Sequence, residues 1–322
     1  MAVKVEIPIE KAAGKVREVT LGATAADGGT RTNTVTVGGE SALPFLHFEA
    51  PMPHRPVVGV EIHDEIPPSW PYHLREAWGD VMNDPAEWAK AAVNTGADLV
   101  VLYLSSTHPD GKNRSPEEAA ETVKAVLKAV GVPLIVYGPG QAEKDNQVLV
   151  KVSEAAAGER IALGDIESTN YRTIVAAALA GGHIVIAQSP IDVNMAKQCN
   201  ILATDMGLPP DRLLMDPTTG ALGYGLEYTY SVMERLRLSA FQDDAMTQFP
   251  MICTVGEESW RQKESKPLDG LPTAWGDLKE RSVFWEILTA TTLLNAGADI
   301  LVLRHPRSVE QVKLAIDKLM KA

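Results

Sequence analysis

The segment 215–227 holds the richest set of residues that could bind a ligand. Asp216 is followed by three glycines within six positions, Gly220, Gly223 and Gly225. Because glycine lacks a side chain, a loop of this kind lets the backbone approach a ligand closely. The alternative is that Asp216 only accepts hydrogen bonds from nearby amides where a helix begins.

The segment 189–194 offers hydroxyl, carboxyl and amide groups in a similar setting. Both segments directly follow short apolar runs, so we expect them at the ends of neighbouring strands. We predict that they bind a ligand together through Ser189, Asp192, Asn194, Asp216, Gly220, Gly223, Tyr224 and Gly225. Further polar groups at expected strand ends are Glu61, Asp64, Ser105, Ser106, Asp165, Thr254, Arg304 and His305.

Several reactive motifs are absent from the sequence. The seven histidines show no H-x-x-x-H spacing, so we expect no built-in metal site. Neither Cys199 nor Cys253 belongs to a C-x-x-C pair, which argues against an iron-sulfur cluster in this chain. The sequence also lacks a G-x-x-x-x-G-K-[ST] phosphate loop and a G-x-S-x-G elbow. We therefore assign no catalytic residue and no metal ligand.

Short apolar runs alternate with amphipathic stretches about eight times from residue 57 onward. The runs lie at 57–62, 99–104, 132–137, 161–163, 184–187, 213–215, 251–255 and 300–303. Between the second and third runs, Ser115, Pro116 and Glu118 are typical of a helix start. Eight strand-helix units predict an α/β fold, a (β/α)₈ TIM barrel over residues 57–322, whose reactive end lies at the carboxyl tips of the strands.

Residues 1–56 precede the first predicted strand and form an N-terminal extension. The stretches 16–21 and 33–37 alternate apolar and polar residues, and Asp27-Gly28-Gly29-Thr30 is typical of a turn between them. We predict a β-hairpin that packs on the barrel and covers its open floor. The alternative is an arm that binds a partner.

Two connections at the reactive end are longer than the two to six residues of ordinary loops. They span 64–83 and 256–277 and hold four of the six tryptophans, Trp70, Trp78, Trp260 and Trp275. These rings either pack the loops on their own barrel or anchor a partner. For Trp70 we favour the anchoring role, because the prolines around it would stiffen an exposed loop.

Composition excludes some classes of protein. The formal net charge of −12 argues against binding nucleic acid, whose phosphates would be repelled. No apolar stretch approaches the ~18 residues of a membrane span, and no signal-peptide core follows the N-terminus. We therefore expect a single cytoplasmic barrel with no nucleic-acid or membrane partner.

Several segments in one order resemble a known family. They read GGESALPFLHFE (38–49), SPIDVNMAKQ (189–198), DPTTGALGYGLE (216–227), YTYSVMER (228–235), CTVGEESW (253–260) and RHP (304–306). The chain resembles the small subunit of the corrinoid iron-sulfur protein, the delta subunit of the acetyl-CoA decarbonylase/synthase system. The likeness covers nearly the whole length of the chain.

The resemblance implies a TIM barrel paired with a large subunit that carries an iron-sulfur cluster and a corrinoid-binding domain. The heterodimer would be the methyl carrier of the Wood-Ljungdahl pathway. It would take a methyl group from methyltetrahydrofolate through a separate methyltransferase and deliver it to acetyl-CoA synthase. In this reading the barrel is a non-catalytic carrier subunit that covers a corrinoid held mainly by the large subunit.

Two rival interpretations remain open. A pterin-binding methyltransferase barrel also places aspartates and asparagines at strand tips, and Asp216 with its glycines is compatible with one. Such an enzyme would bind methyltetrahydrofolate unaided. An aldolase-type barrel would need a lysine on a strand for Schiff-base chemistry, and no predicted strand contains one.

Overall fold

Eight parallel strands form the centre of the molecule in the computed structural model, which describes residues 7–321. They are β3 (Val57–His63), β4 (Leu99–Tyr103), β5 (Leu134–Tyr137), β6 (Ala162–Ile166), β7 (Ile184–Gln188), β8 (Leu213–Asp216), β9 (Ile252–Cys253) and β10 (Ile300–Leu303). Their spatial order is β8-β7-β6-β5-β4-β3-β10-β9. A bridge between Met215 and Met251 joins the two edges. The predicted α/β barrel is thus confirmed.

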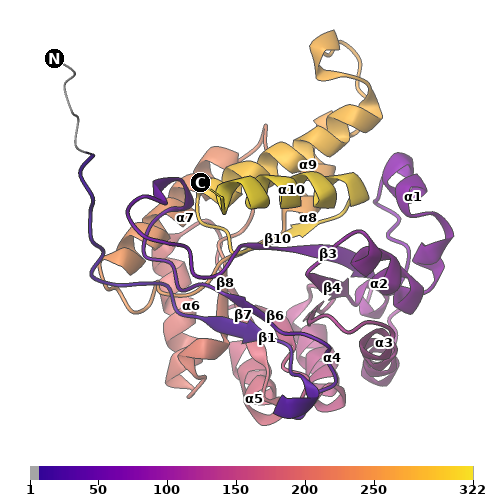
Figure 1. The fold of residues 1–322 in the computed structure, drawn as a ribbon. Coiled ribbons are helices and arrows are strands. Elements are labelled where there is room, and N and C mark those ends of the chain that lie inside the picture. Colours follow the sequence, from indigo (N-terminus) through magenta and orange to yellow (C-terminus); the bar gives the residue numbers. More distant parts are fainter. Residues whose placement is uncertain (1–6, 322) are drawn as a thin grey trace.

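Helices surround the barrel, as Figure 1 shows. They are α1 (Tyr72–Trp78), α2 (Pro85–Asn94), α3 (Pro116–Ala129), α4 (Ala142–Ala155), α5 (Tyr171–Gly181), α6 (Val193–Asp205), α7 (Leu226–Phe241), α8 (Val255–Arg261), α9 (Leu278–Asn295) and α10 (Pro306–Leu319). The predicted start of α3 is confirmed, since the Ser115 hydroxyl accepts a hydrogen bond from the Glu118 amide at 3.2 Å. Within the described residues no helix is long and apolar enough to cross a membrane.

A two-stranded antiparallel sheet precedes the barrel, formed by β1 (Val19–Leu21) and β2 (Val35–Val37). Both strands are shorter than the predicted stretches, and a 3-10 turn at Ala25–Asp27 begins their connection. The four apolar side chains Val19, Leu21, Val35 and Val37 belong to the same buried cluster as Leu99, Ile184 and Ile300. Since these last three begin their strands, the hairpin fills the end of the barrel opposite the strand tips.

Buried arginines hold the N-terminal segment to the barrel. Arg31 is 3% exposed, and its Nε donates to Glu159 at 2.9 Å. Arg237 on α7 forms ion pairs with Glu40 and with Asp299, which lies just before β10. The extension is therefore fixed by charge pairing as well as by apolar packing.

The two long connections contain helices, and the first connection and the start of the second pack on their own barrel. The first includes α1 and a 3-10 turn at Gly79–Asn83, and the second begins with α8. Trp70 is 2% exposed, packs edge-on against Trp88, and lies under the Arg304 guanidinium at 5.0 Å. The expectation that Trp70 anchors a partner is therefore wrong, because its ring is already buried. Trp275 differs, being 40% exposed on a segment that projects from the barrel (Figure 1).

Candidate functional site

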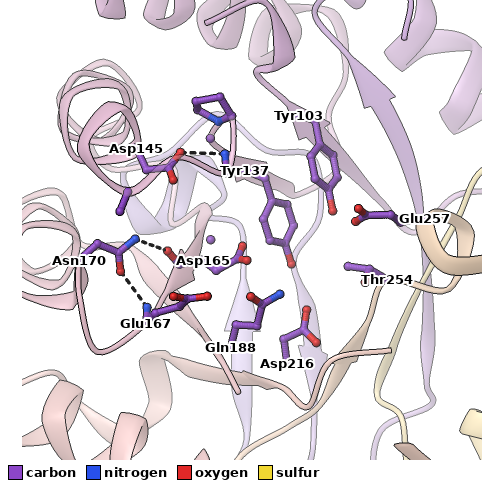
Figure 2. Close-up of a pocket in the computed structure, with 15 residues that line it drawn as sticks. Tyr103, Tyr137, Asp145, Asp165, Glu167, Asn170, Gln188, Asp216, Thr254 and Glu257 are labelled. Atoms are coloured by element: carbon purple, nitrogen blue, oxygen red, sulfur yellow. Dashed lines mark hydrogen bonds between the residues drawn. The ribbon is translucent and has the colours of Figure 1, made fainter. Parts of the chain in front are cut away.

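A cavity of about 430 Å³ opens at the carboxyl tips of the barrel strands. The residues that line it come mainly from the carboxyl ends of β4, β5, β6, β7 and β8 and from α4 and α8. Figure 2 shows their side chains turned toward one space. The lining residues that carry polar side chains are Tyr103, Tyr137, Asp145, Asp165, Glu167, Asn170, Gln188, Asp216, Thr254 and Glu257. The cavity thus occupies the end of the barrel where the sequence predicted the reactive groups.

Two tyrosines form one wall of the cavity. Tyr103 ends β4 and Tyr137 ends β5, and their rings stack with centroids 4.7 Å apart and planes 11° apart. Gly164 on β6 leaves room for this pair, since a Cβ there would lie 2.5 Å from Tyr137 Cε1. The hydroxyl ends of the rings point toward Glu257 and Asp216 (Figure 2). Tyr137 Oη is buried and has no hydrogen-bond partner among the described residues.

Asp216 is the last residue of β8 and is 1% exposed. Its Oδ1 accepts a hydrogen bond from the Thr218 amide at 2.8 Å. Its Oδ2 has no hydrogen-bond partner within residues 7–321. Burial, with the charge of Glu257 adding to it, raises the pKa of Asp216 to about 7. The local hydrogen bond that the sequence offered as the alternative is thus present, and the role of Asp216 in ligand binding stays a prediction.

Three other carboxyl groups of the cavity, those of Asp145, Asp165 and Glu257, also have raised pKa values. Burial and the charge of Asp216 raise the pKa of Asp165 well above its usual value. Burial raises the pKa of Asp145 to about 6, although its side chain accepts a hydrogen bond from the Gly140 amide. Burial and the charge of Glu61 raise the pKa of Glu257. The site is therefore an acid-rich cavity with weakened ionisation.

The structure places the residues predicted at 189–194 around and behind the cavity. Ser189 is buried beside Asp216, with its amide donating to the Asp216 carbonyl at 2.9 Å and its hydroxyl unpartnered among the described residues. Asp192 caps α6, where its Oδ1 accepts from the amides of Asn194 at 2.7 Å and Met195 at 3.0 Å. Asn194 is exposed. Of the eight predicted ligand-binding residues, only Asp216 lines the cavity.

The glycine-rich loop after β8 lies on the rim of the barrel but outside the cavity, since none of residues 217–225 lines it and Gly223 instead lines a second pocket with Trp275 and Trp285. Gly220 is required by packing, since a Cβ there would lie 2.4 Å from the Gly225 carbonyl oxygen. Gly223 and Gly225 have φ values of +86° and +90°, which favour glycine. Tyr224 between them is 77% exposed. This loop therefore offers an exposed ring and open backbone at the edge of the mouth.

A buried ion cluster lies under the mouth on β3 and β10. Glu61 Oε1 is 2.6 Å from Arg304 Nη2 and 2.7 Å from His63 Nε2, and His63 Nδ1 is 2.5 Å from Ser105 Oγ. Burial would raise the pKa of Glu61, but the charge of Arg304 and the His63 hydrogen bond lower it to about 2. Because Arg304 already neutralises Glu61, the cluster supports the strands rather than activating Ser105.

Sequence reasoning missed several residues of the cavity, namely Tyr103, Tyr137, Asp145, Glu167, Asn170, Gln188 and Glu257. Tyr103, Tyr137 and Gln188 end strands, so a systematic reading of all eight tips could have found them. Asp145 and Glu257 lie on helices and carried no such signal. Within the described residues no group of three or more His, Cys, Asp or Glu is placed to hold a metal ion.

Comparisons with known proteins place the chain in a family. The family model described as CO dehydrogenase/acetyl-CoA synthase delta subunit matches residues 18–315. The acetyl-CoA decarbonylase/synthase complex subunit delta of Archaeoglobus fulgidus is 41% identical over 316 residues, which are 96% of this chain and 70% of that protein. The subunit of the same name from Methanopyrus kandleri is 41% identical over 306 residues, covering 94% of this chain and 75% of that protein.

Solved structures with a similar fold include dihydropteroate synthases. The Yersinia pestis enzyme in a sulfonamide drug complex has a TM-score of 0.58 and 15% identity, covering 83% of this chain and 94% of that one. The Coxiella burnetii enzyme in complex with pteroic acid has a TM-score of 0.56 and 14% identity, covering 83% of this chain and 95% of that one. At this level of identity the likeness concerns the barrel fold.

Proposed function

Because the chain belongs to the CO dehydrogenase/acetyl-CoA synthase delta subunit family, we propose that it is the small subunit of a heterodimeric corrinoid methyl carrier. The observation that carries this proposal is the 41% identity over 96% of the chain to a protein named as subunit delta of that complex. The proposed partner is a large subunit that holds the corrinoid and an iron-sulfur cluster. The transient partners are a methyltetrahydrofolate methyltransferase and acetyl-CoA synthase.

The mouth of the barrel fits a large cofactor laid across it. A corrin macrocycle with its side chains exceeds a cavity of about 430 Å³, so it would cover the mouth rather than enter it. Corrinoids carry carboxamide groups at their edge, which need hydrogen-bonding partners. Ser189 Oγ and Asp216 Oδ2 are buried polar atoms without partners among the described residues, and they lie on adjacent loops.

The rim supplies the remaining contacts in this proposal. Tyr224 is exposed and can pack against an apolar edge, while Gly223 and Gly225 leave the backbone open to close approach. Gly220 shapes the loop, and Asp192 fixes the start of α6 so that Asn194 stays at the surface. Asp192 would therefore not contact the cofactor but would hold the loop before α6 in position.

When bound, the corrinoid supplies a cobalt centre that accepts and releases a methyl group. The barrel contributes by orienting the cofactor and by excluding water from its covered face. The partly protonated carboxyls below the mouth can donate as well as accept hydrogen bonds, which suits carboxamides. No residue of this chain needs to act as a catalytic acid or base.

Cobalt content tests the proposal. The chain is produced alone and together with the large subunit, and each preparation is analysed for cobalt and for its visible spectrum. We expect stoichiometric cobalt in the heterodimer and none in the chain alone. Stoichiometric cobalt in the chain alone would refute the carrier-subunit role. Tight binding of methyltetrahydrofolate by the chain alone would favour the pterin-binding methyltransferase instead.

A matched pair of variants locates the cofactor. Gly223→Val introduces a side chain at the rim, whereas Gly182→Val does so at the C-terminal end of α5, in open space and with a similarly positive φ of +76°. Both substitutions strain the backbone to a similar degree. We expect only Gly223→Val to lower the cobalt content of the heterodimer. Equal cobalt content in the two variants would place the cofactor elsewhere on the mouth.

A further inference from the structure

Within residues 7–321, four of the five carboxyl groups of the cavity lack the arginine partners that several other buried acids in this protein have, and the fifth, Glu257, has only Arg261 Nη1 at 3.6 Å from its Oε1. Glu61, Glu159 and Asp299 each pair with a buried arginine. The cavity, in contrast, is lined by Asp145, Asp165, Glu167, Asp216 and Glu257, and no Lys, Arg or His is among the described residues that line it. A set of uncompensated carboxyls in a partly enclosed space is costly unless something else supplies positive charge.

Two buried polar atoms point to a ligand independently of the charges. Tyr137 is 4% exposed and Asp216 is 1% exposed, yet Tyr137 Oη and Asp216 Oδ2 have no hydrogen-bond partner within residues 7–321. Both side chains face the cavity in Figure 2. Buried polar groups in folded proteins are nearly always satisfied, so these two mark the place where donors of a ligand belong.

We propose that this cavity binds an organic cation with several N–H donors, and that a guanidinium group suits it best. A guanidinium carries five N–H donors in one plane and a delocalised charge, so it can reach several acceptors at once. A bare metal ion suits the site less, because the described acids are not clustered closely enough to coordinate one. A cavity of about 430 Å³ has room for the group and its attached chain.

The protonation behaviour of the cavity predicts how such binding depends on pH. Burial and like charges raise the pKa values of Asp216, to about 7, and of Asp165 and Glu257. Inside the cavity these carboxyls face Asp145 on α4, Glu167 after β6, and the phenols of Tyr103 and Tyr137. From behind, Glu257 also faces the charges of Glu61, Arg304, Glu258 and Arg261, and the two arginines partly offset the increase in its pKa. A cation favours the ionised forms, so its binding releases protons and strengthens as pH rises.

The guanidinium group has two sources. It is either part of a free small molecule or the end of an arginine side chain that a companion subunit inserts into the mouth. The chemistry of recognition is the same, and the experiment separates the two. The inference shares Asp216 with the corrinoid proposal, and titration of the chain alone, without corrinoid, tests it separately.

Methylguanidinium and N-methylurea form the probe pair, because they share shape and differ in charge. Each is titrated against the chain alone and followed by ligand-detected NMR at pH 6 and pH 8. We expect methylguanidinium to bind at least tenfold more tightly than N-methylurea. Because the pKa of Asp216 is about 7, the affinity for methylguanidinium should rise about tenfold from pH 6 to pH 8. Equal binding of both probes, or no binding of either, would overturn the proposal.

Two variants assign the binding to the cavity. Asp216→Asn removes a charge with little change in shape, and Tyr137→Phe removes only the unpartnered hydroxyl. Asp211→Asn is the control, since Asp211 is exposed in a 3-10 turn before β8, at the opposite end of the barrel. We expect Asp216→Asn to weaken methylguanidinium binding at least tenfold and Tyr137→Phe to weaken it severalfold. Unchanged affinity in both variants, with unchanged melting curves, would refute the assignment.

Addition of the companion large subunit identifies the source. If that subunit inserts an arginine, it should displace methylguanidinium from this chain, and Asp216→Asn should weaken assembly of the heterodimer. If the ligand is a free molecule, the heterodimer should still bind methylguanidinium and Asp216→Asn should assemble normally. Either result supports the cavity as a cation site. A heterodimer that lacks cobalt but gives the expected methylguanidinium titrations would contradict only the carrier proposal.

Discussion

Arg304→Met should destabilise the protein by removing the charge that neutralises Glu61. Glu61 is fully buried, and its Oε1 receives Arg304 Nη2 at 2.6 Å and His63 Nε2 at 2.7 Å. Removing one partner of a buried ion pair typically costs about 3–5 kcal/mol, since the other charge is left unpaired. Because His63 still contacts Glu61, we expect the lower end, about 3 kcal/mol.

For a barrel of this size, about 3 kcal/mol corresponds to a fall in Tm of roughly 4 °C at pH 7. The control is Arg307→Met, three residues along the chain, because Arg307 and Glu280 form an ion pair at 2.6 Å whose side chains are 51% and 42% exposed. Exposed pairs contribute little, so its melting curve should be unchanged within error. The double variant Glu61→Gln/Arg304→Met should recover much of the loss, since it removes both charges.

The same cluster gives a pH dependence that calorimetry can follow. The pKa of Glu61 lies at about 2 in the folded protein, below its ordinary value of 4.5. Its stabilising contribution is therefore complete above pH 4.5 and is lost as pH falls toward 2. Equal Tm shifts for Arg304→Met and Arg307→Met at pH 7 would refute this account of the buried cluster.

Three further perturbations test other parts of the structure. Gly164→Ala should lower the free energy of unfolding by about 1–3 kcal/mol through overpacking, because its Cβ would lie 2.5 Å from the Tyr137 ring. The control is Gly111→Ala, whose nearest contact is 3.5 Å away and whose thermal unfolding should match that of the wild type. Asp216 has a raised pKa, so its stabilising contribution is full below pH 3.8 and is lost as pH rises to about 7. The difference in Tm between Asp216→Asn and the wild type should therefore favour the variant more at pH 7.5 than at pH 4.5. The same difference at both pH values would contradict the raised pKa of Asp216. Trp70→Ala should lower stability by about 3–5 kcal/mol, and a loss confined to subunit affinity in a binding titration would show that burial of Trp70 is not its main role.

Much of the barrel could be predicted because its strands are covered on both faces. Runs such as 99–104 and 300–303 are almost wholly apolar, which distinguishes them from the amphipathic helices between them. The strand ends were less certain. The run predicted at 251–255 is a strand only at Ile252–Cys253, since Val255 already begins α8. Apolar composition alone does not mark the point where a buried strand gives way to a buried helix.

The resemblance to the delta subunit family is confirmed, but the sequence described the cavity incompletely. It indicated Asp216 and Asp165, because they lie at or next to the ends of strands that could be recognised. It missed Tyr103 and Tyr137, which looked like ordinary apolar strand residues and whose hydroxyl ends became informative only in three dimensions. It placed Trp70 wrongly, because flanking prolines indicate a stiff loop without telling whether the ring faces solvent or its own barrel.

The position of the hairpin determines when the barrel can be completed. Its neighbours come from widely separated parts of the chain, since the Arg17 amide donates to Gln248 at 3.0 Å and Glu40 pairs with Arg237. Contacts so distant in sequence carry a large loop-closure cost and form slowly. The extension can therefore dock fully only once residues near 240 and 300 are in place. Although β1 and β2 can pair with each other earlier, the floor of the barrel is sealed late in folding.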